Sequence, residues 1–206
     1  MDLVLASGSK WRKGLLDSAG IPCRGVAPNI DEYAIVGDTP ALTGAARARA
    51  KARAVAHAVG PSCLVIGADQ VVHLDGVVLS KPCDVRAHVE MLTMLRGRTH
   101  ELLTAVSLVR PRDEGFDERA FHEITLLTMR ADLGDHELAA YAANGEASGC
   151  GGGYMIERLG AQLFCEVRGD WNNVVGLPLF RLITELRALG WRPAFAPPAA
   201  VGGGAG

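Results

Sequence analysis

The stretch VIGADQVVHLDGVVLSKP, residues 65–82, places one acidic residue, Asp69, at the end of an apolar run. An Asp-Gly pair at 75–76 follows, and such a pair between two apolar segments is a strong signal for a β-hairpin turn. We therefore expect two antiparallel strands, CLVIGADQVVHL (63–74) and VVLSKP (77–82). In this setting Asp69 is either a metal-binding catalytic carboxylate or a polar residue that only punctuates the hairpin.

Strand and helix patterns alternate before this hairpin. Ser9 and Thr39 each precede a helical pattern and are typical N-caps, and Pro40 stands at a first helical position, where a missing N–H is tolerated. The expected segments are a strand over 2–6, a helix from 10 to about 19, a strand that ends at Asp31 and Glu32, and a helix that ends before Gly60.

The chain after the hairpin continues this mixture. The glycine-rich SGCGGGYMIE (148–157) indicates close backbone packing or a turn beside a ligand. The other expected segments are a helix from about 84 to 96, strands over 99–110 and 120–130, a helix capped by Asp135 that runs through Ala143, a strand over 162–169, a loop over 169–173 and a helix that opens at 176–180. We expect one α/β domain over 1–190 with an extended mixed sheet, and a disordered Pro/Ala/Gly-rich tail over 191–206.

Composition restricts the partners. The 206 residues carry a formal net charge of −2, whereas a nucleic-acid-binding protein normally has a basic surplus. No apolar run reaches the roughly 18 residues that cross a bilayer, and the N-terminus lacks the basic start of a signal peptide. The five cysteines have no CxxC spacing, which favours reduced thiols. We expect a cytoplasmic protein with neither a nucleic-acid nor a membrane partner.

The segment LASGSKWRKGLL (5–16) reads as a strand, a turn of small residues and a helix start. Backbone N–H groups at a helix start, together with Ser7 and the guanidinium of Arg12, would make an anion pocket. The segment does not match the P-loop motif GxxxxGK[ST], which excludes a P-loop. A capped surface helix with solvated cations explains the segment equally well.

Three acidic residues could supply the oxygen ligands that Mg²⁺ prefers, namely Asp31, Glu32 and Asp69. Adjacent acids such as the first two are usually only turn residues. If a carboxylate orients an attacking water, Lys51 and Lys81 could neutralise phosphate charge as the water attacks. The basic residues between 47 and 53 otherwise read as a solvated helix face.

Other reactive residue types make weaker candidates. His100 and His122 lie in strand patterns and are better explained as packed or paired side chains. Cys150 and Cys165 have no neighbouring base that would activate a nucleophile.

Together the motifs resemble the Maf family of nucleoside triphosphate pyrophosphatases over about residues 3 to 187. The resemblance lies in LVLASGSKWRKGLL, IDE, AKARAV, VIGADQVVHLDGVVLSKP, GRTHELLTAVSLV, GGGYMIERLGAQLFCEVRGD and NVVGLPL. It implies an ITPase-like α/β fold with two lobes around a cleft, and a homodimer. It also implies hydrolysis of a nucleoside triphosphate to the monophosphate and pyrophosphate with a divalent metal, Mg²⁺ or Mn²⁺.

The resemblance also implies residue roles. Asp69 would be the general base or a metal-linked acid, Glu32 would sit at the metal, and Lys81 would act with them in catalysis. The phosphates would be held by Ser7, Arg12, Lys51 and Lys81.

Three further positions resemble the residues that select the base in this family: Trp11, Gln70 and Glu157. The set is similar to the branch associated with 7-methyl-GTP, because a tryptophan can stack on a cationic purine and a carboxylate can accept from guanine N–H groups. The alternatives are a dTTP/UTP enzyme, whose branch usually has Arg, Thr and Gln at these places, and a nucleotide-sensing regulator of cell division.

Overall fold

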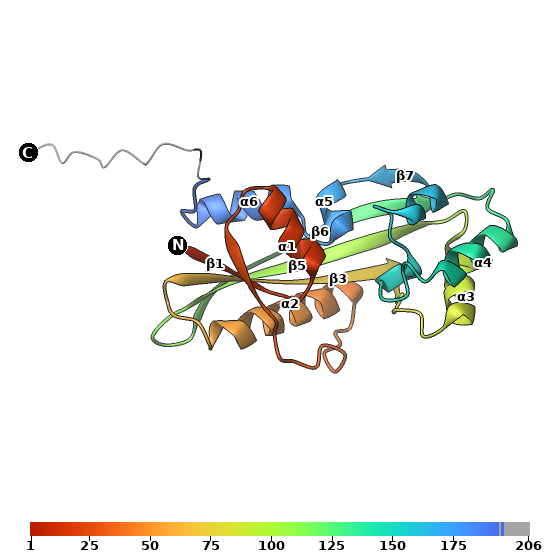
Figure 1. Ribbon diagram of the computed structural model, residues 1–206. Helices are drawn as coiled ribbons and strands as arrows, with labels where there is room; N and C mark the ends of the chain where they lie inside the picture. The colour runs from red at the N-terminus through yellow and green to blue at the C-terminus, as the bar shows by residue number, and fades with distance from the viewer. Residues whose placement is uncertain (194, 196–206) are drawn as a thin grey trace, which may run out of the picture.

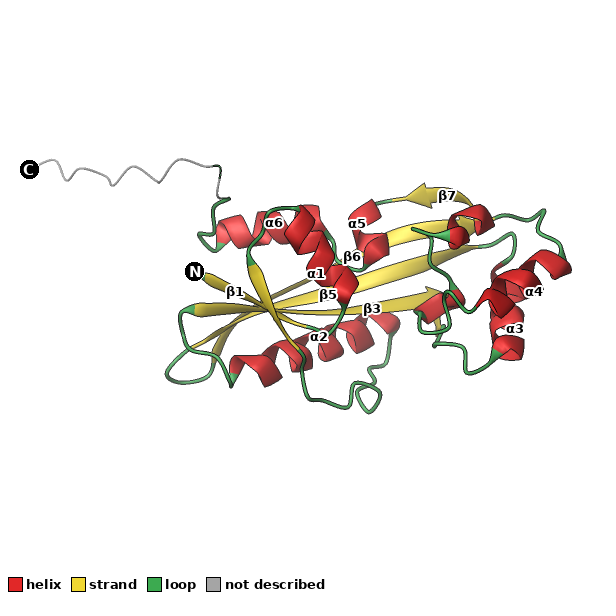
Figure 2. Ribbon diagram, viewed as in Figure 1, coloured by secondary structure: helices red, strands yellow, loops and turns green. Residues whose placement is uncertain are grey.

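A seven-stranded mixed β-sheet forms the centre of the computed structural model, which describes residues 1–193 and 195 (Figures 1 and 2). Its order is β2-β1-β3-β5-β6-β7, with β4 paired to β3. The β1 strand pairs in parallel with β2 and β3, and all other pairings are antiparallel. The strands are β1 (Asp2–Ala6), β2 (Cys23–Val26), β3 (Cys63–Leu74), β4 (Val77–Val78), β5 (Thr99–Pro111), β6 (Phe116–Met129) and β7 (Phe164–Arg168).

Helices cover both faces of this sheet. The helices are α1 (Lys10–Ser18), α2 (Pro40–Ala56), α3 (Val85–Leu95), α4 (Asp135–Asn144), α5 (Trp171–Val175) and α6 (Leu179–Ala188), with short 3₁₀ turns η1 (Gly151–Gly153) and η2 (Leu159–Leu163). Figure 1 shows α1 and α6 on one face and α2 on the other. Alternation along β1 produces this layering, because Leu3 and Leu5 pack with α1 and α6 while Val4 and Ala6 pack with α2.

The α2 helix lies unusually close to β3 at Gly67. A Cβ atom at this position would stand 2.2 Å from Ala48 O and 2.8 Å from Ala52 Cβ, so a larger residue would push the helix away. The close approach brings Lys51, one residue before Ala52, next to Asp69, two residues after Gly67.

The buried core divides into two lobes. One is built on β1, α1, α2 and α6, and the other packs α3, α4, η2 and β7 against the far ends of β3, β5 and β6. This division agrees with the expected α/β fold. Within the described residues, no helix is long and apolar enough to cross a membrane.

Several boundaries differ from the sequence prediction. The strand expected to end at Asp31 and Glu32 stops at Val26, and the second hairpin strand covers only 77–78 before the chain leaves β3. The α2 helix ends four residues before Gly60, because the N–H groups of Ala58 and Val59 bond three residues back, to Val55 O and Ala56 O.

Differences also occur near the C-terminus. Gly134, not Asp135, is the N-cap of α4, where Glu137 accepts from its backbone N–H. The loop expected over 169–173 contains the start of α5, capped by Asp170. Trp191 still packs on the core beside α6; most of the tail predicted over 191–206 lies outside the described residues.

Candidate active site

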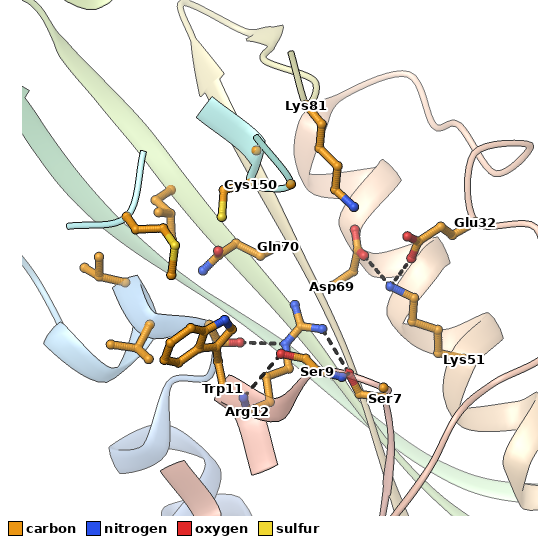
Figure 3. A pocket seen from close by; sticks show the side chains of 18 of the residues that line it. Ser7, Ser9, Trp11, Arg12, Glu32, Lys51, Asp69, Gln70, Lys81 and Cys150 are labelled. Carbon is orange, nitrogen blue, oxygen red and sulfur yellow. Dashed lines mark hydrogen bonds and ion pairs between the residues drawn. The ribbon is translucent and has the colours of Figure 1, made fainter. Parts of the chain in front are cut away.

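One cavity of about 600 Å³ opens between the two lobes, and all nine predicted site residues line it (Figure 3). They reach it from separate segments: the β1–α1 turn, the start of α1, the loop after β2, α2, β3, the loop after β4 and the segment after η1. The nine are Ser7, Trp11, Arg12, Glu32, Lys51, Asp69, Gln70, Lys81 and Glu157.

The buried ammonium of Lys51 joins two carboxylates in this cavity. Its Nζ lies 2.6 Å from Asp69 Oδ1 and also pairs with Glu32 Oε2. Partial burial alone would raise the pKa of Glu32, but the hydrogen bond from Lys51 and the charges of Lys51, Lys81 and Arg47 outweigh it and lower that pKa. Glu32 is therefore held as an anion at neutral pH.

The second carboxylate oxygen of Asp69 is the unusual atom of the site. Oδ2 is buried and has no hydrogen-bond partner among the described residues. A buried carboxylate oxygen without a hydrogen bond is costly and calls for a cation or a water at bonding distance. Among all the residues that the structure describes, no three His, Cys, Asp or Glu side chains lie close enough together to hold a metal. Glu32 and Asp69 thus fit a divalent cation whose remaining ligands come from substrate phosphates and water.

The β1–α1 turn forms an anion-binding corner beside these acids. Arg12 donates from Nε to Gly176 O at 2.9 Å and from Nη1 to Ser7 Oγ at 3.4 Å. Ser9 caps α1 by accepting from the Arg12 N–H. Burial lowers the pKa of Arg12, whereas Asp69 and Glu32 oppose that change. A guanidinium fixed in this way presents a preorganised positive charge to a phosphate.

Arg47 belongs to this charge network, although the sequence pattern placed it on a solvated face. Its Nε donates to Ile35 O at 2.9 Å, and its Nη1 lies 4.0 Å from Asp69 Oδ2. The residue thereby ties the loop that carries Glu32 to α2. The signal was available in the sequence, because residues four apart on a helix share a face and Arg47 is four residues before Lys51.

The side-chain amide of Gln70, which also lines the cavity, is fixed by two hydrogen bonds. Its Nε2 donates to Asn173 O at 2.7 Å and to Thr104 Oγ1 at 3.1 Å. The backbone carbonyl of Asn173 can only accept, so the assignment of nitrogen and oxygen is unambiguous. Both amide hydrogens are used, and the group that Gln70 can still offer to a ligand is the Oε1 acceptor.

Trp11 lies near two cations at the same end. Arg158 Cζ and Lys10 Nζ each lie 5.5 Å from the centre of its ring. Figure 3 shows Trp11 and Cys150 on one side of the cavity and Glu32 and Lys51 on the other. The cavity therefore has a charged end and an end built from an aromatic ring, an amide and apolar side chains.

The remaining candidates divide between core and surface. His100 is 1% exposed and hydrogen-bonded to Tyr154, as its strand pattern predicted. His122 lies opposite Ala105 in the β5–β6 pair, but its side chain is exposed. Cys150 lines the cavity, and burial and the nearby Glu157 raise its pKa, while Lys81 opposes them. Cys165 is exposed.

The chain is similar to known proteins along nearly its whole length. A family model described as "Maf-like protein" matches residues 2–189. A dTTP/UTP pyrophosphatase of Symbiobacterium thermophilum is 42% identical over 99% of this chain and 98% of its own. A nucleoside triphosphate pyrophosphatase of Gluconobacter oxydans is 41% identical over 91% of this chain and 94% of its own. A solved dITP/XTP pyrophosphatase of Mycobacterium abscessus, 20% identical, matches over 92% of this chain and 98% of its own with a TM-score of 0.43.

Proposed function

Because the chain belongs to the Maf-like protein family, we propose that it is a nucleoside triphosphate pyrophosphatase. The reaction class is hydrolysis of a phosphoanhydride bond, which yields a nucleoside monophosphate and pyrophosphate. The observation that carries the proposal is one cavity in which Lys51 joins Glu32 to Asp69 beside the guanidinium of Arg12. The names of relatives that align over almost the whole chain support it.

In the proposed reaction a water oxygen bonds to the α phosphorus. The bond from that phosphorus to the bridging oxygen breaks, pyrophosphate leaves, and the water proton passes to a carboxylate, a role that we assign to Asp69. Arg12, Lys51 and Lys81 stabilise the negative charge that develops on the phosphate oxygens. Ser7 and the start of α1 orient the phosphate chain.

A divalent metal, Mg²⁺ or Mn²⁺, is part of the proposal. Glu32 and Asp69 would hold it, and the buried, unpartnered Oδ2 of Asp69 is the observation that favours this assignment. Such an ion neutralises phosphate charge when bound. The proposed homodimer and cytoplasmic location rest on the family resemblance and the thiol pattern, and sedimentation tests the first.

For the base, dTTP and UTP are the better-supported substrates. Several relatives carry these nucleotides in their names. The free Oε1 acceptor of Gln70 suits the N3–H of uracil or thymine. The cations of Lys10 and Arg158 beside the Trp11 ring favour a neutral base, since a cationic base stacked there would add a third positive charge.

One observation keeps 7-methyl-GTP, the first expectation from the sequence, as a second candidate. Glu157 lines the cavity with Trp11 and Gln70, and its carboxylate can accept from guanine N1–H and the exocyclic amine. The base of dTTP or UTP is neutral and that of 7-methyl-GTP is cationic, so a direct comparison separates the two candidates.

The test is a substrate panel scored for pyrophosphate. Side-by-side kcat/KM values on dTTP, UTP, GTP and 7-methyl-GTP identify the preferred base, and we expect dTTP and UTP to lead. Preference for 7-methyl-GTP would reverse the base assignment and leave the reaction class intact. Tight nucleotide binding with no pyrophosphate from any nucleotide would contradict the enzyme and favour a nucleotide-sensing regulator.

A further inference from the structure

Three consecutive residues, of which the last two line the cavity, are each held by a side chain from a different element. His88 of α3 donates from Nε2 to Gly153 O. Tyr154, the next residue, has its hydroxyl 2.7 Å from His100 Nε2 of β5. The N–H of Met155 donates to the hydroxyl of Tyr141 in α4 at 3.0 Å.

The three holding side chains, which we call the wall clamp, are deeply buried. His88 is 2% exposed, His100 1% and Tyr141 8%. Burying a polar group costs free energy unless the group is hydrogen-bonded, so these pairings favour one conformation of the segment that they hold. They come from three separate elements and converge on adjacent residues: His88 and Tyr141 hold backbone groups, and His100 holds the side chain of Tyr154.

The same contacts explain why the sequence has a glycine at position 153. Gly153 has φ +70°, and a Cβ atom there would lie 2.7 Å from the His88 ring. A side chain at this position would displace the imidazole that holds the carbonyl. The glycine therefore allows the close approach on which the His88 contact depends.

The held segment carries groups that line the cavity at the end beside Trp11. Tyr154, Met155, Ile156 and Glu157 all line the cavity. The acids and cations at the other end are held instead by Lys51, Arg47 and Arg12. The two ends of the cavity thus have separate supports.

We propose that His88, His100 and Tyr141 are positioning residues that hold the wall over residues 151–157 and thereby set which nucleobase the cavity accepts. The inference rests on the proposed function, since it takes the cavity to bind a nucleoside triphosphate. The clamp residues act through the wall, and the charged end, with its own supports, keeps its geometry when they are changed.

Tyr141→Phe is the decisive variant because it removes one oxygen atom and retains the ring. We expect the preference for UTP, measured as the dissociation constant of the α,β-methylene analogue of GTP divided by that of the UTP analogue, to fall about fivefold, the effect of losing the hydrogen bond to Met155. Amide exchange at Met155 should speed up. His88→Leu should act in the same way, and His88→Gln, which keeps an N–H donor, should stay within about twofold of the native chain.

Leu186→Ala in α6 is the control, because Leu186 is fully buried in the other lobe. It lowers stability without touching the wall and should leave both the ratio and the Met155 exchange rate unchanged. If Tyr141→Phe also leaves the ratio within about twofold, below the effect of one hydrogen bond, this inference is overturned and the proposed function stands. A native chain that binds neither analogue would overturn both. If the native chain binds the analogues but releases no pyrophosphate from UTP or GTP, only the proposed function is overturned.

Discussion

The ammonium of Lys51 lies 2.6 Å from Asp69 Oδ1 and also pairs with Glu32, so one buried cation joins two acids from distant segments. The α2 helix carries this lysine and can approach β3 because Gly67 has no side chain. The hydrogen bond and charge of Lys51 help to lower the pKa of Glu32 beside the phosphate-binding cations.

Replacing Lys51 with Met should reduce both activity and stability. Removing one partner of a buried ion pair leaves an uncompensated charge and costs about 3–5 kcal/mol of unfolding free energy. Losing a preorganised charge at the reacting phosphate should lower kcat/KM by roughly 10²- to 10³-fold. Pyrophosphate release and chemical denaturation measure the two effects.

Arg49→Met is the matched control on the same helix. Arg49 is exposed and pairs with Glu118, far from the cavity. It should change kcat/KM by no more than about twofold and stability by less than ~1 kcal/mol. Equal losses in the two variants would show that Lys51 acts only through the fold of α2.

Arg47→Leu should lower kcat/KM by about tenfold, because one charge-assisted contact to the Glu32 loop is lost. The hydrogen bond to Ile35 O disappears, so the loop is no longer tied to α2. Steady-state kinetics at saturating metal measure the change. Arg53→Leu is the control: Arg53 pairs with Glu118, and this variant should have native activity. Native activity in Arg47→Leu would show that Arg47 does not belong to the site.

The stability of the fold should decrease as the pH falls from 7 to 5. Burial, with a contribution from the neighbouring His73, lowers the pKa of His100 to about 4, whereas the unfolded chain takes up its proton near pH 6.5. Between these values only the unfolded state is protonated, so stability is full above about pH 6.5 and is lost toward pH 4. The loss from pH 7 to 5 is about 2 kcal/mol.

Urea denaturation at the two pH values measures this loss. His100→Phe cannot take up a proton and should lose about 2 kcal/mol less than the native chain over the same interval. His122→Gln alters an exposed histidine and should keep the native pH dependence. Identical slopes for the native chain and His100→Phe would rule out His100 as the source.

Removing divalent metal should abolish turnover without loosening the fold. In the described part of the chain no set of three side chains could hold a metal without substrate. EDTA should therefore stop pyrophosphate release, and added Mg²⁺ or Mn²⁺ should restore it, while the Tm of the nucleotide-free chain stays the same. A drop of Tm in EDTA would instead reveal a resident structural metal.

Local chemistry made the strands and most helices predictable. The Asp75-Gly76 turn formed where the dipeptide indicated, because both residues adopt the positive φ that this turn needs. The caps Ser9 and Thr39 each accept from the backbone of the first helical turn. Short elements were missed, since α5 has only five residues and no periodicity to recognise.

The site was predictable as a set of residue types, but its geometry was not. The family resemblance selected nine residues that share one cavity, yet spacing along the chain does not reveal that Lys51 bridges Glu32 and Asp69. It also did not reveal that Gln70 uses both amide hydrogens on Thr104 and Asn173. Such contacts depend on how separate elements pack.

The measurement that tests the central claim most directly is phosphorus NMR of UTP incubated with the chain and Mg²⁺. We predict UMP and pyrophosphate in equal amounts, and neither product with Asp69→Asn. Formation of UDP and orthophosphate, or full activity in Asp69→Asn, would contradict the assignment of this cavity as a nucleoside triphosphate pyrophosphatase site.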